Sequence, residues 1–310
     1  MKKSNRDLFV RYDQNPILRE DMWPYEINSV FNPGAVRLAN GKTLLFCRVE
    51  DKTGKSHLTK AISFDGIGDW HIDSEPTYLP ELDIRDNWGI EDPRITYLTD
   101  VKKYAVVYTA YGTSGPSIAL SLTTDFTNFE RLGTIIHADD KDAALFPRQI
   151  DGRWVLIHRP MNDLGSNMWI SFSKDLVHWG DHKLFLETRE GSFWDSYKIG
   201  LATPPIETKE GWLIIYHGVR ITAAGAIYRI GLALFDLNDP QKCIKRGNEW
   251  IFGPKTTYEL LGDVGNVIFP CGFTILPDND TIYLYYGAAD TCIGLAFGSI
   301  SRMLLWLHEQ

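Results

Sequence analysis

The segment from residue 89 to residue 95, Gly-Ile-Glu-Asp-Pro-Arg-Ile, places two carboxylates directly before a proline and an arginine. Carboxylates serve enzymes as general acids and bases, and cleavage of a glycosidic bond requires a proton donor together with a nucleophile. Asp92 is the candidate donor. Because side chains alternate along a strand, we expect Asp92 and Arg94 to face the same way and Glu91 to face oppositely. A tight ion pair with Arg94 would lower the pKa of Asp92, so the donor role requires Arg94 to be engaged elsewhere.

The second carboxylate that such chemistry normally needs has no obvious position in the sequence. Only Asp195 and Asp290 compete for that role. Basic side chains recur around the same predicted mouth instead, and in an acidic protein a local basic cluster suggests an anion site. Phosphate is the natural anion because charge-assisted donors hold it well. The basic candidates are Arg48, Lys52, Lys55, Lys141, Lys198 and His217.

Strands must position these candidates, because stretches of helical period are scarce in this chain. Runs of five to eight aromatic and β-branched residues, bounded by Gly, Asn, Asp and Pro, recur along the whole sequence. Five apolar hairpins follow one another, and each is expected to open at a proline. The markers are Pro33, Pro93, Pro147, Pro204 and Pro270, at intervals of 60, 54, 57 and 66 residues. One structural unit therefore recurs about every sixty residues.

Each unit continues with a third strand, and the first four units add a fourth. The last unit lacks a fourth strand because the chain leaves it for SRMLLWLHEQ (301–310), a predicted short helix. The N-terminal segment LFVRYDQNPIL (8–18) is the spare strand that completes this unit. The sequence thus predicts an all-β fold: a five-bladed β-propeller, closed by the N-terminal strand, as a single domain over residues 1–310. A two-sheet sandwich is the alternative.

The innermost strands of a propeller line its channel, so polar residues at their ends gather at its mouths. Recurrence at equivalent positions of several units favours a site over isolated turn caps. Two charged segments, ADDKDAALFP and SFWDSYKIGLATPP, feed directly into inner strands and are placed to point over the channel. The polar positions are Asn32, Arg48, Asp92, Lys141, Asp142, His158, Arg159, Asp195, Lys198, Tyr216, His217 and Asp290.

Composition narrows the class of protein. The 310 residues are 44% hydrophobic and 23% charged, an ordinary composition for a soluble domain with a sizeable core. The net charge of −8 disfavours nucleic-acid and anionic-membrane partners, because neutralising phosphates needs a basic face. No apolar run approaches the roughly 18 residues of a membrane span, so we expect a cytoplasmic protein. The four cysteines lack metal-ligand spacing, and we expect no metal site.

Eight segments occur through the chain in this order: FNPGAVRL, FCRVED, GKSHL, GIEDPRITYL, KDAALFPRQIDGRWVLIHRP, WDSYKIGLATPPIET, GWLIIYHGV and YYGAADT. Together they resemble glycoside hydrolase family 130, the β-mannoside phosphorylases and their few hydrolytic relatives. The resemblance implies a five-bladed propeller, in agreement with the repeat. It also implies an inverting reaction that transfers a terminal β-mannosyl residue to inorganic phosphate. The products would be α-mannose 1-phosphate and a shortened sugar, with phosphate as co-substrate and no other cofactor.

The resemblance further implies roles for individual residues. Asp92 falls on the family's single catalytic acid, whose proton passes through the 3-hydroxyl of the bound mannose. Some members place an arginine shortly after the segment that matches RVE, and here only Lys52 or Lys55 can replace it, without the bidentate fork. The substrate-binding set is Asn32, Arg48, Arg94, His158, Asp195 and Asp290. The phosphate-binding set is Lys52, Lys141, Lys198, Tyr216 and His217.

Two other functions stay open from the sequence. A hydrolase of the same fold would use water activated by a base carboxylate, and the basic residues argue against it. A non-catalytic carbohydrate-binding propeller would stack sugars on Trp23, Trp88 and Trp194, but it leaves Asp92 and the lysines without a role. The acceptor sugar is not identified: we expect β-1,2-linked mannobiose or mannooligosaccharides, with β-1,4 linkages, glucose and N-acetylglucosamine open. Assembly into a homo-oligomer is also open.

Overall fold

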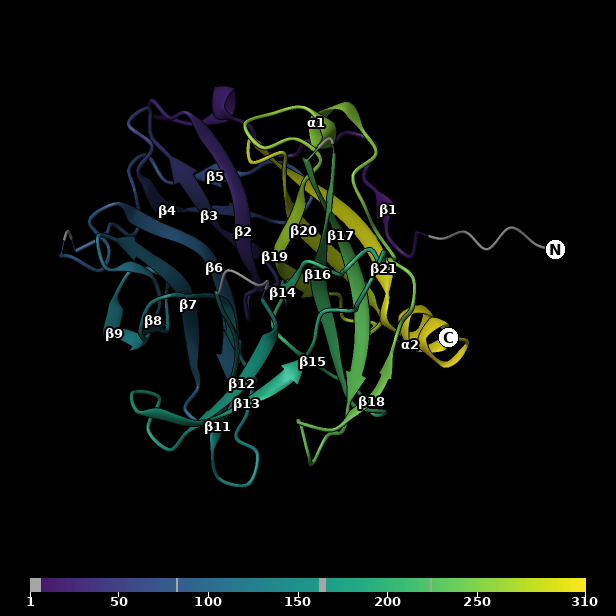
Figure 1. The fold of residues 1–310 in the computed structure, drawn as a ribbon. Helices are drawn as coiled ribbons and strands as arrows, with labels where there is room; N and C mark the ends of the chain where they lie inside the picture. Colours follow the sequence, from purple (N-terminus) through teal and green to yellow (C-terminus); the bar gives the residue numbers. More distant parts are fainter. Residues whose placement is uncertain (1–6, 82, 162–165, 224) are drawn as a thin grey trace.

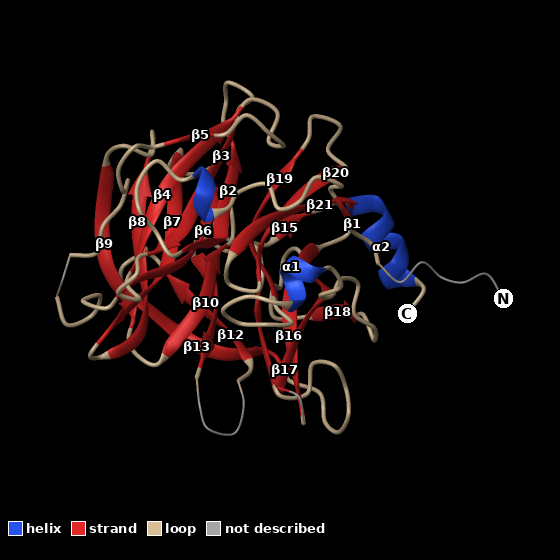
Figure 2. Ribbon diagram, turned by 90° about the horizontal axis from the view of Figure 1, so that it is seen from above, coloured by secondary structure: helices blue, strands red, loops and turns tan. Residues whose placement is uncertain are grey.

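The computed structural model describes residues 7–81, 83–161, 166–223 and 225–310, and this part of the chain is almost entirely β-structure (Figure 2). Its helices are short: the 3₁₀ turn η1 (Glu20–Met22), α1 (Thr257–Leu260) and α2 (Ile300–His308). The predicted all-β fold and the short C-terminal helix are confirmed. Among the described helices, none has the length and apolar character needed to cross a bilayer.

The strands form four hydrogen-bonded sheets. The largest sheet contains two antiparallel groups joined by one parallel bridge between Ser56 and Gly89, so five antiparallel groups succeed one another along the chain in Figure 1. The first group contains β2 (Ser29–Arg37), β3 (Thr43–Glu50), β4 (Ser56–Ser63) and β5 (His71–Ile72). The second contains β6 (Gly89–Leu98), β7 (Lys103–Gly112), β8 (Gly115–Thr123) and β9 (Phe129–Ile136). The third contains β10 (Asp140–Leu145), β11 (Trp154–Pro160), β12 (Met168–Ser173) and β13 (Trp179–Leu186).

The last two groups depart slightly from this pattern. The fourth group contains β14 (Lys198–Leu201), β15 (Ile206–Glu207), β16 (Trp212–Thr222), β17 (Gly225–Phe235) and β18 (Cys243–Arg246). The fifth contains β19 (Ile268–Ile275), β20 (Thr281–Ala288), β21 (Cys292–Ser299) and the N-terminal strand β1 (Val10–Arg11). In β1, Val10 lies opposite Phe297 and Arg11 opposite Ala296. The N-terminal segment therefore supplies the strand that the last group lacks, as the sequence predicts.

The apolar core lies between successive groups rather than in one central layer. Separate clusters of buried side chains fill the spaces between the first and second, second and third, third and fourth, fourth and fifth, and fifth and first groups. Strand β11 shows how the sequence builds this arrangement. Trp154 and Leu156 pack toward the second group, whereas Val155 and Ile157 pack toward the fourth. Because alternate side chains enter two cores, the central strands read as continuous apolar runs.

The prolines mark the inner strands less regularly than the repeat predicts. Those of the first, second and fifth groups lie inside β2, β6 and β19, but Pro147 and Pro204 follow the ends of β10 and β14. The two inner strands instead begin at Asp140 and Lys198. Proline cannot donate to a strand ladder, so the ladder forms in the charged segments that precede it. Lys141 and Lys198 therefore stand on inner strands, not on loops before them.

Three inner strands contain the same local irregularity. Asn32 in β2, Asp92 in β6 and Asp142 in β10 adopt left-handed backbone conformations, with φ of 45°, 50° and 56°. The register of each strand with its neighbour shifts at this residue. Asn and Asp tolerate positive φ better than other non-glycine residues, and a bulge redirects the side chain that it carries. The bulges turn three polar side chains toward one end of the inner strands.

Candidate active site

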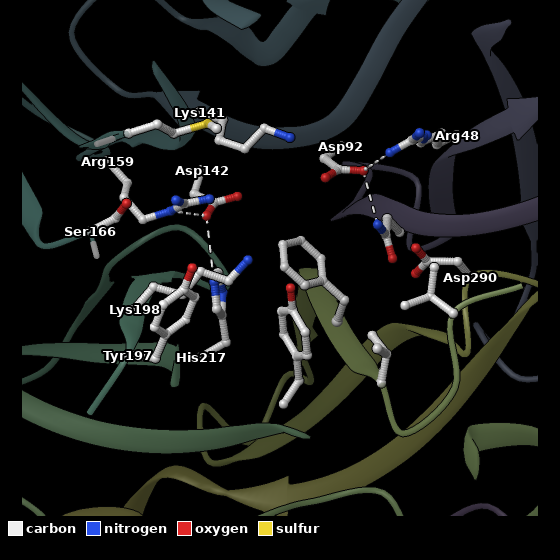
Figure 3. A pocket seen from close by; sticks show the side chains of 16 residues that line it. Arg48, Asp92, Lys141, Asp142, Arg159, Ser166, Tyr197, Lys198, His217 and Asp290 are labelled. Atoms are coloured by element: carbon white, nitrogen blue, oxygen red, sulfur yellow. Dashed lines mark hydrogen bonds and ion pairs between the residues drawn. The ribbon is translucent and has the colours of Figure 1, made fainter. Parts of the chain in front are cut away.

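A cavity of about 280 Å³ lies at this end of the inner strands (Figure 3). Its wall comes from all five groups and from the loop that precedes β19. Apolar and aromatic side chains, such as Phe269 and Val264, form part of the wall, but charge dominates it. The charged and titratable residues at the cavity are Arg48, Asp92, Lys141, Asp142, Arg159, Lys198, His217, Tyr228 and Asp290.

Asp92 is buried on one side of the cavity, where two side chains hold it. Its Oδ1 accepts hydrogen bonds from Asn32 Nδ2 at 2.9 Å and from Arg48 Nη1 at 3.0 Å. Gly287 makes room for this contact, since a Cβ atom there would lie 1.9 Å from the Asn32 oxygen. Glu91 also reaches Arg48, with 3.1 Å between Oε1 and Nη2. Of the two acidic neighbours only Asp92 lines the cavity, as expected, whereas Arg94, which was expected to share its face, does not line it.

Arg94 makes its hydrogen bonds away from the Asp92 carboxylate, but its charge still helps to lower the pKa of Asp92, so the condition set by the sequence is met only in part. Its Nε donates to the carbonyl of Ala202 at 2.8 Å and its Nη2 to that of Leu201 at 2.7 Å. Its Nη1 reaches the backbone carbonyl of Asp92, not the side chain. The guanidinium is buried, does not line the cavity, and ties β6 to the end of β14. Its position favours a supporting role over the predicted direct contact with substrate.

The two carboxylates on this side have pKa values displaced in opposite directions. Burial by itself would raise the pKa of Asp92, but the charges of Arg48, Lys141 and Arg94 and the hydrogen bond from Asn32 lower it below its ordinary value. Burial and neighbouring carboxylates together raise the pKa of Asp290 to about 7, although the charge of Arg48 opposes the rise. A raised pKa suits a proton donor, so these shifts do not by themselves identify Asp92 as the acid.

The opposite side of the cavity is basic and is organised around Asp142. Its Oδ2 accepts a 2.7 Å hydrogen bond from Arg159 Nε and lies 3.4 Å from His217 Nε2 (Figure 3). Gly200 permits this approach, because a Cβ atom there would lie within 2.5 Å of both Asp142 and His217. Although burial favours the neutral form, Arg159, His217 and Arg94 hold the pKa of Asp142 well below its usual range. Asp142 therefore stays ionised and fixes the groups around it.

Lys198 and Lys141 complete the basic side, and both point into the cavity in Figure 3. Burial and the nearby Arg159 charge lower the pKa of Lys198. Its Nζ has no hydrogen bond or ion pair with any residue in the described ranges, and it lies 5.1 Å from the centre of the Tyr228 ring. Lys141 Nζ lies 3.6 Å from Glu91 Oε2 and so links the two sides. The basic side thus presents an ammonium group to any ligand.

His217 contributes a neutral ring to the basic side. Burial lowers its pKa to about 3. The negative charge of Asp142 opposes this shift, and the positive charges of Arg159 and Lys198 add to it. Neither ring nitrogen makes a hydrogen bond to a residue that the structure describes. The ring packs on Phe269, with 4.7 Å between the ring centres. A neutral imidazole held in this way can donate one N–H to an anion without adding charge.

Several residues predicted for the site lie outside the cavity. Lys52 is on the surface, with its side chain 66% exposed and paired with Glu26, and Lys55 is exposed as well. Asp195 is fully buried behind the wall, where its Oδ2 accepts hydrogen bonds from Arg246 at 2.7 Å and Tyr216 at 3.0 Å. These positions exclude direct contact with a ligand in the cavity. The placement of Lys52, Asp195 and Tyr216 at the site is corrected accordingly.

His158 also lies behind the wall, while its neighbour Arg159 lines the cavity. The His158 ring bridges Asp140 at 2.6 Å and Ser171 at 2.7 Å. Asp140 in turn accepts a 3.0 Å hydrogen bond from the backbone N–H of Arg159. Adjacent residues on a strand face opposite ways, so only one of this pair can reach the cavity. His158 thus supports the strand that presents Arg159, a residue missing from the predicted phosphate-binding set.

Sequence reasoning missed two aromatic residues of the wall, Tyr197 and Tyr228, which line the cavity together with Phe269. Asp142, which the sequence places at the channel but in neither binding set, organises the basic side. Nothing in the sequence distinguishes Tyr197 and Tyr228 from the many other aromatic residues of the chain. Within the described residues, no group of three or more His, Cys, Asp or Glu side chains is arranged to hold a metal ion.

Comparison with known proteins extends over the whole chain. A glycoside hydrolase 130 family model, described as beta-1,4-mannooligosaccharide phosphorylase, matches residues 2–309. The chain is 35% identical to a beta-1,4-mannooligosaccharide phosphorylase of Ruminococcus albus, over 98% of this chain and 92% of the relative. It is 38% identical to a 1,2-beta-oligomannan phosphorylase of Thermoanaerobacter sp., over 92% and 95% respectively. The solved structure of Beta-1,2-Mannobiose phosphorylase from Listeria innocua, in complex with beta-1,2-mannobiose, superposes with a TM-score of 0.88 at 31% identity, covering 97% of this chain and 99% of that one.

Proposed function

Since this chain belongs to glycoside hydrolase family 130, we propose a specific reaction for it. The enzyme is a glycoside phosphorylase that transfers a mannosyl residue from a β-mannoside to inorganic phosphate. Phosphate attacks the anomeric carbon on the face opposite the leaving sugar, so the configuration inverts. The products are α-mannose 1-phosphate and a shortened mannoside. Phosphate is a co-substrate, and the proposal requires no other cofactor.

One observation carries this proposal: a single cavity holds the candidate acid Asp92 on one side and a basic cluster on the other. Asp92 protonates the leaving oxygen through the 3-hydroxyl of the mannosyl residue, while Asn32, Arg48 and Asp290 hold that residue. Phosphate binds opposite them. Its proposed ligands are Lys141, Arg159, Lys198 and His217, in which Arg159 replaces the unsuited Lys52. A charge-assisted fork from arginine suits a phosphate better than a lysine does.

A hydrolase is the weaker alternative because the site lacks a free base. An inverting hydrolase needs a second carboxylate to activate water on the far side of the sugar. Asp142 occupies that side, but its Oδ2 is bonded to Arg159 at 2.7 Å and its Oδ1 lies 3.5 Å from Arg94. Its pKa is held well below the usual range, which makes it a poor base. The surrounding cations suit an anionic nucleophile instead.

For the fold we propose a five-bladed β-propeller forming a single catalytic domain over residues 1–310. Five apolar clusters join the groups in sequence, and one of them joins the fifth group to the first. Strand β1 completes the last blade. Closing a ring in this way protects the strand edges. We further propose a cytoplasmic enzyme with an oligosaccharide substrate and with neither nucleic acid nor a membrane as partner; whether it forms a homo-oligomer is left open.

We propose β-1,2-linked mannobiose or mannooligosaccharide as the substrate. Curated relatives of similar identity act on β-1,2 and on β-1,4 linkages, so the acceptor needs a direct test. The enzyme is incubated with α-mannose 1-phosphate and a panel of acceptors: mannose, glucose, N-acetylglucosamine and β-1,4-mannobiose. Phosphate release and the linkage of the product are measured. Fastest release with mannose, giving a β-1,2 bond, is the expected result; a β-1,4 product would replace the proposed linkage.

A further inference from the structure

The acidic side of the cavity holds more carboxylates than cations. Arg48 is the guanidinium on this side, and three carboxylates lie close to it. Its Nη1 contacts Asp92 at 3.0 Å, and its Nη2 contacts Glu91 at 3.1 Å and Glu50 at 3.6 Å. Asp290 is a fourth carboxylate, and Figure 3 shows it on the same side of the cavity as Asp92 and Arg48. Lys141 adds one charge here, directed at Glu91.

Asp290 is the member of this group without a counterion. Its side chain makes no hydrogen bond or ion pair with any residue in the part of the chain that the structure describes, whereas Glu50, Glu91 and Asp92 all contact Arg48. A partly buried carboxylate with like charges nearby favours its neutral form. Here four carboxylates share two cations, Arg48 and Lys141, so protonation is least costly at the carboxylate without an ion pair. That carboxylate is Asp290.

The backbone next to Asp290 is held by hydrogen bonds, which fixes where its side chain starts. Ala289 and Asp290 form a turn between β20 and β21, with φ of 47° and 52°. The N–H of Ala289 donates to Val267 at 3.0 Å, and the carbonyl of Ala289 accepts from Val264 at 3.1 Å. Both valines line the cavity next to the turn. The carboxyl group is thus confined between an apolar loop and other carboxylates.

The remaining ionisable groups around Asp290 do not compensate its charge. Burial, together with the charges of Asp92, Glu91 and Glu50, raises its pKa to about 7 against the opposing charge of Arg48. Tyr228 faces the cavity from β17, and burial raises its pKa to about 12, so it stays neutral and offers no positive charge. The ordinary pKa of an aspartate is about 3.9, well below the working range of most enzymes. Asp290 is therefore placed to titrate near neutrality.

We propose that Asp290 is a neutral carboxylic acid in the ligand-free enzyme and donates a hydrogen bond to the mannosyl residue in the cavity. This inference rests on the proposed function for the identity of the ligand, but not for the protonation state. A neutral Asp290 gives the acidic side a hydrogen-bond donor beside Glu50 and Glu91, which as carboxylates can only accept. It also removes one negative charge from beside the sugar. Ionisation of Asp290 then weakens binding and turnover together.

Kinetics give the first test of this inference. In the wild-type enzyme kcat/KM is expected to fall about tenfold per pH unit above about pH 7, because this quantity reports groups of the free enzyme. Asp290→Asn cannot ionise and still donates, so this alkaline limb is expected to disappear. Phosphate ionises equally in both assays, so the difference between the two enzymes isolates Asp290. Asp290→Ala, which cannot donate, is expected to be slower than Asp290→Asn at every pH. An unchanged alkaline limb in Asp290→Asn would overturn the inference.

A ligand-free titration tests the protonation state even if the proposed substrate is wrong. The enzyme is labelled with ¹³C at aspartate carboxyl groups, and the Asp290 resonance is assigned by its absence from Asp290→Asn. Its midpoint is expected near pH 7. In Glu50→Gln, which removes a negative charge outside the cavity wall, the midpoint is expected to move to lower pH. A midpoint near the ordinary aspartate value of about 3.9 in the wild-type protein contradicts the proposal.

Discussion

The two sides of the cavity are built with opposite charge surpluses. On the acidic side, Arg48 is shared by three carboxylates, and a fourth, Asp290, stands without a partner. On the basic side one carboxylate, Asp142, is bonded to Arg159 and lies next to His217. On each side a residue of the less common charge, Arg48 or Asp142, forms ion pairs with residues of the opposite charge. The cavity can therefore bind a sugar and an anion side by side without either site neutralising the other.

The comparison also shows how burial acts on each side. It raises the pKa of Asp290 to about 7 and lowers that of His217 to about 3. Both shifts remove a charge that would otherwise add to the local surplus. Near neutral pH the acidic side thus loses a negative charge, and the basic side avoids an extra positive one. Among the charges that remain, Glu50, Glu91 and Asp92 contact Arg48, and Arg159 contacts Asp142.

The largest expected effect comes from the acidic side. Asp92→Asn keeps the shape of the side chain but removes the transferable proton, so kcat should fall by roughly 10² to 10⁴-fold. Asp13→Asn serves as a matched control, because Asp13 is exposed and away from the cavity. Steady-state kinetics in saturating phosphate measure both. If Asp92→Asn kept more than about a third of wild-type turnover, the acid would have to lie elsewhere on this side, with Glu91 the nearest candidate.

An intermediate effect is expected from the basic side. Lys198→Ala removes a charge-assisted contact worth roughly 1.5–3 kcal/mol, so the KM for phosphate should rise about 10 to 100-fold. The KM for the mannoside should change far less, because the sugar is held opposite. Lys52→Ala is the control, since its side chain is 66% exposed and paired with Glu26. If the phosphate KM of Lys198→Ala stayed within about twofold of wild type, the assignment of the phosphate site to the basic side would be contradicted.

His217 should give the smallest effect, because its contribution is a neutral hydrogen bond. His217→Gln is expected to raise the phosphate KM about 3 to 10-fold, corresponding to roughly 0.5–1.5 kcal/mol. With a folded pKa lowered to about 3, the ring stays neutral as the pH falls through the ordinary histidine value. The pH profiles of phosphate KM for wild type and variant should therefore run parallel above about pH 5. A step near pH 6.5 present only in the wild type would show that His217 is charged.

The neutral His217 ring also determines how the stability of the folded state changes with pH. Because the folded state keeps His217 deprotonated, the unfolded chain binds more protons between the folded value of about 3 and the ordinary value of 6.5. The contribution of His217 to stability is therefore complete above the unfolded value and is lost as the pH falls through this window. Asp290 has the opposite sign. Its raised pKa makes the folded state lose stability as the pH rises from about 4 to about 7.

The sequence predicts the strands and part of the acidic side for clear physical reasons. Strands buried on both faces leave continuous apolar runs, and an Asn or Asp before proline in such a run marks a bulge. Asn32 and Asp92 follow this rule and line the cavity. The N-terminal strand could be predicted because one group lacked a fourth strand. The C-terminal helix could be predicted because the apolar residues of the last ten positions have a helical period. These features depend on local sequence alone.

The remaining site residues depend on which face a strand presents, and a single sequence does not state this. In the pair His158–Arg159 the arginine lines the cavity, and in the pair Tyr216–His217 the histidine does. Predicting one member of each pair is then a choice between two faces. The prediction that Lys52 binds phosphate was wrong for a different reason. Strand β3 ends at Glu50, so Lys52 lies in a surface turn and not at the cavity. Distant partners such as Asp142 and Gly200 come together only in the fold.

The central claim is that the basic side holds phosphate as the nucleophile. β-1,2-Mannobiose is incubated with the enzyme in phosphate and in a phosphate-free buffer, and the products are resolved by ³¹P and ¹H NMR. The account predicts α-mannose 1-phosphate and mannose in equal amounts with phosphate present, and almost no cleavage without it. Release of free mannose alone, at equal rates in both tubes, would contradict the account and make water the nucleophile.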